Sequence, residues 1–509
     1  MKAGKEYGVR RIFASLLAAA ASPAFAQLPC EQLKSIELPT AIVSLAESTA
    51  AGPFRLPGAP AESPALALPG HCRVALTLRP SADSDIKAEV WLPPAADWNG
   101  KLLMEGGGGF VGYISYGAMA VALREGYATA STDTGHVGGN ASFALGHPEK
   151  LVDFAYRAVH ETAVKTKAII AAYYGRGPRL SYFQGCSTGG RQGLLEAQRY
   201  PEDFDGIIAG APANNQIPLC AWRMAIVAAS LKDPASALST VKTALLNNAV
   251  LDACDALDGV RDRLLADPRK CRFDPATLLC RGPEQDNCLT AAQLDTVKMA
   301  YADARKKNGE LFYPGLPPGG ETGWRLPGPA KEPGGIDLGM FRIIAHQDAN
   351  WDWRTFDLER DWALAMERAG FMEATDPDLS LFKARGGKVL IYHGWNDGGS
   401  GGAISPLNSI AYHQRVLDRM GPEQKEWLRL FMVPGMAHCR GGPGPNQFSA
   451  LAALERWRES GIAPDRIVAA RVTNGRVDMT RPLCPFPQVA VYGGSGSTND
   501  AGNFACKAP

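Results

Sequence analysis

The chain has 509 residues, of which 46% are hydrophobic and 21% are charged, and its formal net charge is +1. This composition is typical of a soluble globular protein, and the length predicts two domains or one enlarged domain. The balanced charge gives no basic face and no acidic tail, which argues against a nucleic-acid partner.

The first 26 residues have the pattern of an export signal. Basic residues at positions 2, 5, 10 and 11 precede an apolar run over residues 12–21, and Ala24-Phe25-Ala26 forms a small-residue cleavage site. The apolar run of about ten residues is too short to span a bilayer, so a signal peptide over residues 1–26 is favoured over a membrane anchor. We predict a secreted or periplasmic protein without membrane attachment after cleavage. Arg10-Arg11 leaves both the Sec and the twin-arginine route open.

Strands and helices are predicted to alternate over residues 86–213. Strand-like segments cover 86–92, 101–104, 127–132 and 180–184, and helical patterns cover 153–174 and 191–199. The segment 214–385 is rich in helices and loops instead, and strand patterns return at 388–392 and 427–433. We expect a largely parallel sheet covered on both faces and interrupted by an insertion.

Ser187 is the candidate nucleophile. Gly185-Cys186-Ser187-Thr188-Gly189 matches the G-x-S-x-G nucleophile elbow, and it follows a predicted strand and precedes a predicted helix. The flanking glycines are needed because a Cβ would clash in so tight a turn. A serine in an ordinary turn is the alternative, and the strand-to-helix context disfavours it. The elbow predicts an α/β-hydrolase fold in which the Thr188 amide faces a developing oxyanion.

A serine hydroxyl needs a general base, and His438 is the candidate among eight histidines. It follows a predicted strand near the C-terminus, and α/β-hydrolases run in the chain order serine, acid, histidine. Asp397 lies between the two and would orient the imidazole; an Asx turn or a helix cap is its alternative role. The rival histidines are His393, interpreted as packing beside a strand end, and His136, interpreted as shaping a loop.

The glycine-rich segment 105–110 follows an early predicted strand and is expected to supply the second amide of an oxyanion hole. A phosphate-binding loop is the alternative. It is disfavoured because no Walker lysine follows and the spacing is not G-x-G-x-x-G.

In an exported protein the eleven cysteines can form stable disulfides, because disulfides persist outside the cytoplasm. The odd count leaves at least one cysteine unpaired within the chain. Spacing alone does not fix the connectivity, although Cys254/Cys271 and Cys280/Cys288 are close enough for local loops. Cys186 precedes the nucleophile and Cys439 follows the base. If Ser187 and His438 meet, these two cysteines come within disulfide reach.

This arrangement resembles the tannase and feruloyl esterase family, in which such a cysteine pair is a hallmark. The resemblance covers nearly all of the mature chain and includes the segments 131–136, 153–157, 185–193 and 205–212. It implies a catalytic triad made by Ser187, Asp397 and His438. It also implies an oxyanion hole made by the amide of Thr188 and that of either Gly108 or Gly109. It also implies an α/β-hydrolase catalytic domain, residues 27–213 and 386–509, with a large inserted lid domain, residues 214–385.

The resemblance further implies five disulfides: Cys30–Cys72, Cys186–Cys439, Cys254–Cys271, Cys280–Cys288 and Cys484–Cys506. Cys220 is left over, and burial is the simple explanation for it.

A calcium loop in the lid is also implied. Asp255, Asp258 and Asp262 would be side-chain ligands, and Val260 and Leu264 would add their carbonyls. Three carboxylates around a glycine suit a hard cation, although from the residues alone a solvated acidic turn is an equal alternative. The spacing is not that of an EF-hand. The ion would be structural, and no organic cofactor is expected.

The expected function is that of a serine carboxylic-ester hydrolase acting on small aromatic esters, such as feruloyl or galloyl esters, through an acyl-enzyme. A mono(2-hydroxyethyl) terephthalate-type hydrolase is the alternative, although Gly398-Gly399-Ser400 stands where an aromatic clamp is expected. Arg325 and Arg342 are candidates to bind the terephthalate carboxylate. A non-catalytic exported binding protein on the same fold is disfavoured by the intact triad. The aromatic residues of the insertion either stack on the acyl group or belong to the core: Trp324, Phe341, Trp351 and Trp353.

Overall fold

A computed structural model describes residue 1 and residues 27–508, apart from positions 59, 61, 111, 325–331 and 399–403. The predicted signal segment beyond Met1, and the candidate Arg325, lie outside the described residues. Within the described part of the chain, none of the helices combines the length and the apolar character needed to cross a membrane.

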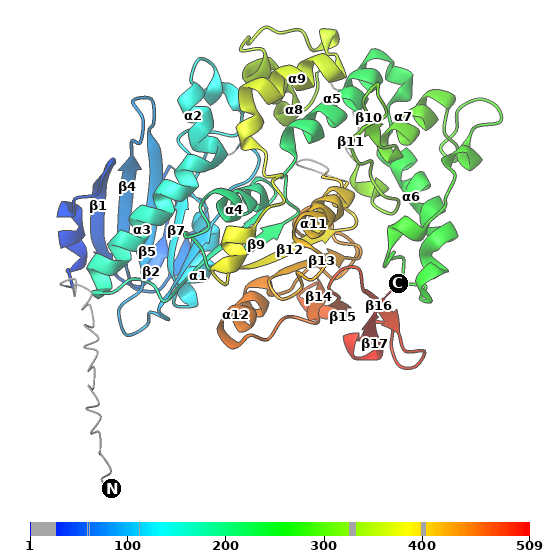
Figure 1. The fold of residues 1–509 in the computed structure, drawn as a ribbon. Coiled ribbons are helices and arrows are strands. Elements are labelled where there is room, and N and C mark those ends of the chain that lie inside the picture. Colours follow the sequence, from blue (N-terminus) through cyan, green and yellow to red (C-terminus); the bar gives the residue numbers. More distant parts are fainter. Residues whose placement is uncertain are drawn as a thin grey trace.

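A nine-stranded sheet forms the centre of the molecule, in the order β1-β4-β5-β7-β6-β8-β9-β12-β13 (Figure 1). Its strands are β1 (Ala41–Thr49), β4 (His71–Leu78), β5 (Ile86–Leu92), β6 (Lys101–Glu105), β7 (Ala128–Thr132), β8 (Leu180–Cys186), β9 (Gly206–Gly210), β12 (Lys388–Gly394) and β13 (Leu428–Val433). The strands from β7 to β13 are paired in parallel. At the other edge β1, β4, β5 and β7 pair antiparallel. The predicted strands are therefore present, and the prediction lacked the antiparallel strands β1 and β4 and the parallel strand β9.

Helices cover both faces of the sheet, because successive strand residues alternate between two apolar clusters. Phe183 contributes to the cluster under α3, α4 and α11, whereas its neighbour Tyr182 packs with α1 and α12. The helices of this part are α1 (Tyr116–Arg124), α2 (Pro148–Val152), α3 (Ala158–Tyr174), α4 (Thr188–Arg199), α11 (Pro406–Met420) and α12 (Ala450–Ser460). The segment predicted as one helix over 153–174 begins with a π-helical turn, Asp153–Arg157, before α3.

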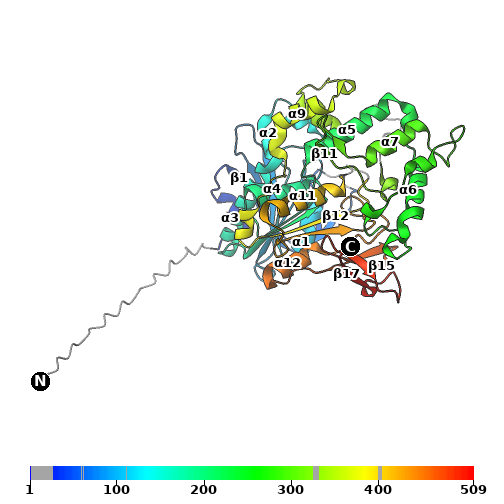
Figure 2. The same ribbon diagram turned by 45° about the vertical axis from the view of Figure 1, so that its right-hand side comes forward.

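The inserted segment, residues 214–385, adds no strand to the nine-stranded sheet in its described residues. It contains α5 (Gln216–Lys232), α6 (Thr240–Cys254), α7 (Ala291–Tyr301), α8 (Gly335–Gly339), α9 (Leu358–Ala369), α10 (Ser380–Ala384) and the short pair β10 (Ala304–Arg305) and β11 (Leu311–Tyr313). Figures 1 and 2 show α5 to α9 gathered on one side of the sheet. Their apolar faces form a cluster that also includes Phe110 of the glycine loop, so the insertion packs directly on the segment after β6.

The aromatic residues of the insertion belong to this core rather than to an open surface. Trp324, Phe341, Trp351 and Trp353 are all buried in it. Three further antiparallel pairs complete the fold: β2 (Gly52–Phe54) with β3 (Leu66–Leu68), β14 (Ile467–Thr473) with β15 (Arg476–Leu483), and β16 (Val489–Tyr492) with β17 (Phe504–Lys507).

Five disulfides cross-link the chain, and they join the same pairs that the family resemblance implies: Cys30–Cys72, Cys186–Cys439, Cys254–Cys271, Cys280–Cys288 and Cys484–Cys506. Cys220 is a buried free thiol on α5. Such a set of disulfides is typical of proteins that fold in an oxidising compartment.

Candidate active site

Ser187 stands in the sharp turn between β8 and α4. Its backbone has φ 64° and ψ −122°, a conformation that L-residues rarely adopt and that costs about 1–3 kcal/mol. The turn needs glycine on both sides, because a Cβ on Gly185 would lie 2.6 Å from the carbonyl carbon of Gly189. The helix begins at Thr188, three residues before the predicted start, so the serine is placed directly at a helix N-terminus.

The disulfide Cys186–Cys439 joins the serine turn to the histidine loop. The Cα atoms of these cysteines lie 5.9 Å apart, although 253 positions separate them in sequence. Ser187 and His438 are therefore held near each other through their neighbours. The hydrogen bonds of the described residues do not include one from the Ser187 hydroxyl to His438. Catalytic hydrogen bonds are often long in a ligand-free enzyme and tighten in the substrate complex.

Asp397 is buried, with 1% of its surface exposed, and two imidazoles face it. Its Oδ2 lies 2.7 Å from His438 Nδ1 and 3.0 Å from His393 Nε2. Burial alone would raise the pKa of Asp397, but the His438 charge and the hydrogen bonds of both histidines outweigh burial and lower it. Asp397 is therefore held as a carboxylate that orients His438.

His393 thus has a second role beyond the packing that the sequence predicts. It packs beside the end of β12 as expected, and it also fixes the acid. Its Nδ1 lies 2.7 Å from the Ser409 hydroxyl, and its Nε2 also lies 3.1 Å from the Ile404 carbonyl oxygen. The spacing of four residues between a strand-end histidine and Asp397 was the available signal for this contact.

The glycine loop lies against the serine turn. The Gly107 amide donates to Gln192 Oε1 at 3.0 Å, and the Gly106 amide donates to the Gln184 carbonyl at 2.9 Å, so both are already used. A Cβ on Gly189 would meet the Gly107 carbonyl oxygen at 2.7 Å, which explains why the two glycine segments can approach so closely. Gln192 was missed by the sequence analysis, because only the packing of α4 on the loop reveals its role.

One cavity contains the serine and one of the two candidate glycines. Gly109, Ser187 and Thr188 line it together, whereas Gly108 is not among its lining residues. The Thr188 hydroxyl donates to the Gly109 carbonyl at 3.0 Å, and this bond fixes the glycine loop against the serine turn. At the far end of this loop, His136 Nε2 lies 2.8 Å from the Phe110 carbonyl, in agreement with its interpretation as a loop-shaping residue.

The opposite wall of this cavity comes from the inserted segment. Leu219 and Ile336 provide apolar surface, and Arg223 is the charged residue of the lining. Arg223 donates to Asp337 Oδ1 through Nε at 3.0 Å, so its charge is balanced inside the protein. Cys186 and Cys439 line a separate, wider cavity, but its lining does not include Ser187.

Residues 72–507 match the model of the tannase and feruloyl esterase family. The chain belongs to this family. It is 39% identical to an uncharacterized esterase of Xanthomonas campestris pv. campestris, over 98% of this chain and 95% of the relative. It is 36% identical to a protein of Aspergillus flavus named probable feruloyl esterase B-1, over 86% of each chain.

Solved structures agree with this membership. The crystal structure of feruloyl esterase B from Aspergillus oryzae matches with a TM-score of 0.87 at 31% identity, covering 94% of this chain and 99% of that one. The tannin acyl hydrolase of Aspergillus niger shares the fold, with a TM-score of 0.76 at 24% identity over 96% and 94% of the two chains. The predicted α/β-hydrolase fold is therefore confirmed, and this member of the tannase and feruloyl esterase family is a carboxylesterase.

The implied calcium ligands of this tannase-family esterase lie in the turn after α6. Asp258 Oδ1 accepts from the Val260 amide at 3.0 Å, and Asp262 Oδ1 accepts from the Leu264 amide at 3.1 Å. Burial and the neighbouring carboxylate of Asp262 raise the pKa of Asp255. An all-oxygen donor set in which carboxylates repel one another fits a hard divalent cation such as calcium.

The positively charged side chain of Arg481 also reaches this turn. Arg481 Nη2 lies 2.6 Å from Asp262 Oδ2, and both side chains are buried. Asp258, Asp262 and Arg481 line one small cavity. Arg481 therefore already balances one of the three aspartates, while Asp255 and Asp258 have no basic side chain bonded to them in the described structure.

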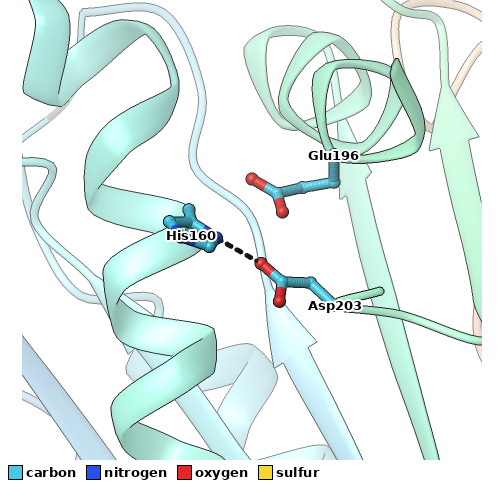
Figure 3. Close-up of side chains that lie close together, drawn as sticks. All are labelled: His160, Glu196 and Asp203. Atoms are coloured by element: carbon cyan, nitrogen blue, oxygen red, sulfur yellow. Dashed lines mark hydrogen bonds and ion pairs between the residues drawn. The ribbon is translucent and has the colours of Figure 1, made fainter. Parts of the chain in front are cut away.

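A second group of possible metal ligands lies between α3 and α4. His160, Glu196 and Asp203 point toward one another, with ligand atoms within 4.8 Å (Figure 3). His160 Nδ1 lies 2.6 Å from Asp203 Oδ2, and Lys167 Nζ lies 3.7 Å from Asp203 Oδ1. Burial and the Asp203 charge raise the pKa of Glu196 well above its usual range. Neither Glu196 oxygen has a hydrogen-bond partner in the described structure, whereas His160 and Lys167 already face Asp203. A neutral Glu196 would add no negative charge for a cation, so we assign no metal to this group.

Proposed function

We propose that this carboxylesterase is an exported serine hydrolase of phenolic-acid esters, such as feruloyl or galloyl esters, with Ser187 as nucleophile, His438 as general base and Asp397 as the orienting acid. The observation that carries the proposal is the Asp397–His438 hydrogen bond of 2.7 Å in a loop that a disulfide joins to the serine turn. The family assignment supports the ester substrate.

The mechanism follows from these positions. The Ser187 oxygen attacks the ester carbonyl carbon while His438 takes the hydroxyl proton, and the charged imidazole is stabilised by Asp397. The carbonyl oxygen becomes an oxyanion that the amides of Thr188 and Gly109 stabilise at the helix N-terminus. His438 then returns the proton to the leaving alcohol, which leaves an acyl group on Ser187.

Water completes the cycle. It attacks the acyl carbon as His438 removes one of its protons, and the carboxylic acid is released when the Ser187 oxygen regains a proton from the imidazole. We assign the second oxyanion amide to Gly109, because Gly109 and not Gly108 lines the cavity with the serine.

The terephthalate alternative has less support. A terephthalate monoester carries a free carboxylate that needs a basic partner in the acyl cavity. Arg223 is bonded to Asp337, and the candidate Arg342 faces Glu332 at 3.3 Å and is not in the lining of the Ser187 cavity. The charged residue of the described lining is thus already paired with a carboxylate.

Export and a structural calcium ion complete the proposal. The five disulfides support an oxidising compartment, reached through the predicted signal peptide. Calcium would be held by Asp255, Asp258 and Asp262 with the Val260 and Leu264 carbonyls. It would supply positive charge to the turn and take no part in the reaction.

Replacement of the nucleophile tests the catalytic assignment. With methyl ferulate as substrate, Ser187→Ala should lower kcat on the order of 10⁶-fold, because triad members act as a unit. A fluorophosphonate probe should label the wild-type enzyme and not this variant. Ser44→Ala, at an exposed serine of β1, is the matched control and should keep both the hydrolysis of methyl ferulate and the labelling by the probe. A Ser187→Ala enzyme within tenfold of the wild type would refute the assignment.

The calcium assignment has a separate test that does not depend on activity. The Tm of the metal-free protein should rise with calcium and fall again with chelator, and Asp258→Asn should abolish this response. The control is Asp252→Asn, at an exposed residue of the same region that is bonded to Arg263. An equal Tm with calcium and with chelator would rule out a calcium site here.

A further inference from the structure

Gln216 presents a buried polar atom that the protein itself does not use. It is the first residue of α5, only 3% of its surface is exposed, and it lines the same cavity as Ser187. Its side-chain oxygen Oε1 is buried and has no hydrogen-bond partner in the described structure. Buried polar atoms of native proteins are nearly always hydrogen-bonded, so an unpaired acceptor in a substrate cavity indicates that the ligand provides the donor.

The rest of the cavity makes this acceptor distinctive. Leu219, Ile336 and Ile404 give it apolar walls on which an aromatic ring can pack. The polar side chains of Thr188 and Arg223 are already bonded, to the Gly109 carbonyl and to Asp337. Apart from Ser187, the described lining thus offers the Gln216 oxygen as a buried acceptor that has no partner.

We propose that Gln216 is a specificity-determining residue that accepts a hydrogen bond from a ring hydroxyl of the acyl group. This inference rests on the proposed function and names the residue that would recognise the ring hydroxyl of its phenolic-acid esters. A hydroxyl can both donate and accept, and a carboxamide offers both functions, so the two groups are complementary. An unsubstituted ring would leave Oε1 buried and unpaired in the complex, which penalises that substrate.

Esters that differ only in the hydroxyl test the proposal. The substrates are methyl cinnamate, methyl 3-hydroxycinnamate and methyl 4-hydroxycinnamate, compared by kcat/KM. For the wild-type enzyme, kcat/KM for the faster of the two hydroxylated esters should be about tenfold or more above that for methyl cinnamate. Gln216→Met, which keeps the side-chain length and removes the amide, should reduce the preference to within about twofold by slowing the hydroxylated ester. The control Gln414→Met makes the same change at an exposed residue of α11 and should retain the wild-type ratio.

A second measurement needs no variant. Methylation of the preferred ring hydroxyl removes its proton, so the methoxy ester should fall to the level of methyl cinnamate with the wild-type enzyme. A wild-type ratio near one, a Gln216→Met enzyme that keeps the full preference, or a methoxy ester as fast as the hydroxy ester would overturn the role of Gln216 while hydrolysis of aromatic esters continued. Failure to hydrolyse any of these esters, with short alkyl esters still cleaved, would instead refute the proposed function.

Discussion

Removal of the Cys186–Cys439 disulfide should affect stability and catalysis together. In the chain-entropy description, a cross-link stabilises a protein by an amount that grows with the loop it closes. The separation of 253 residues corresponds to about 5.5 kcal/mol, whereas the separation of 8 residues between Cys280 and Cys288 corresponds to about 2.5 kcal/mol. The double variant Cys186→Ala/Cys439→Ala should therefore unfold at clearly lower urea concentration than Cys280→Ala/Cys288→Ala.

The two variants should differ even more in activity. The first loses the bond between the serine turn and the histidine loop, and a displacement of about 1 Å at reacting groups can lower the rate about a hundredfold. The second lies in the inserted segment and should keep kcat/KM within about twofold. Both are measured with methyl ferulate at a temperature and pH where circular dichroism shows each variant folded. Equal kcat/KM values for the folded variants would refute the idea that this disulfide maintains the catalytic geometry.

Two histidines away from the nucleophile give further predictions. His393→Phe keeps a ring and removes the donor to Asp397, so it should lower kcat about tenfold with little change in KM; an unchanged kcat would contradict this role. His413 is buried, and burial lowers its pKa from 6.5 to about 4, so its neutral form is the one compatible with the fold. The stability that depends on this neutral form is complete above pH 6.5 and is lost as the pH falls toward 4, by about 3 kcal/mol. The free energy of unfolding is measured by urea titration at pH 7 and at pH 4. Between these pH values, His413→Gln should lose about 3 kcal/mol less stability than the wild type. If both proteins lose the same amount, His413 is not the cause.

Much of the sheet was predictable because its central strands are buried on both faces and read as short apolar runs. The segment 86–92 coincides with β5, and β8 and β12 extend their predicted ranges by only two residues. Strand β4, which lies between β1 and β5, was missed although burial largely alternates along His71–Leu78, the period of a half-buried strand. The π-helical turn at Asp153–Arg157 leaves no such periodicity in the sequence, so the segment was read as regular helix.

The candidate site was predictable as far as local sequence specifies it. The serine turn depends on neighbouring glycines, and the order of Ser187, Asp397 and His438 along the chain is sufficient to nominate them. The contacts of His393 with Asp397 and of Gln192 with the glycine loop depend on how distant elements pack. Gln216 could not be found from sequence, because a helical glutamine becomes informative only when its amide is seen to be enclosed without a partner.

The cavity around Ser187 is assembled from two sources. The groups that we propose break the ester bond follow the ends of central strands, whereas Gln216, Leu219 and Ile336 come from the inserted segment. Substitutions in the insertion can therefore alter which acid is accepted while bond cleavage itself is preserved. Such a division of labour lets selectivity change on one stretch of polypeptide while the groups proposed for hydrolysis stay on another.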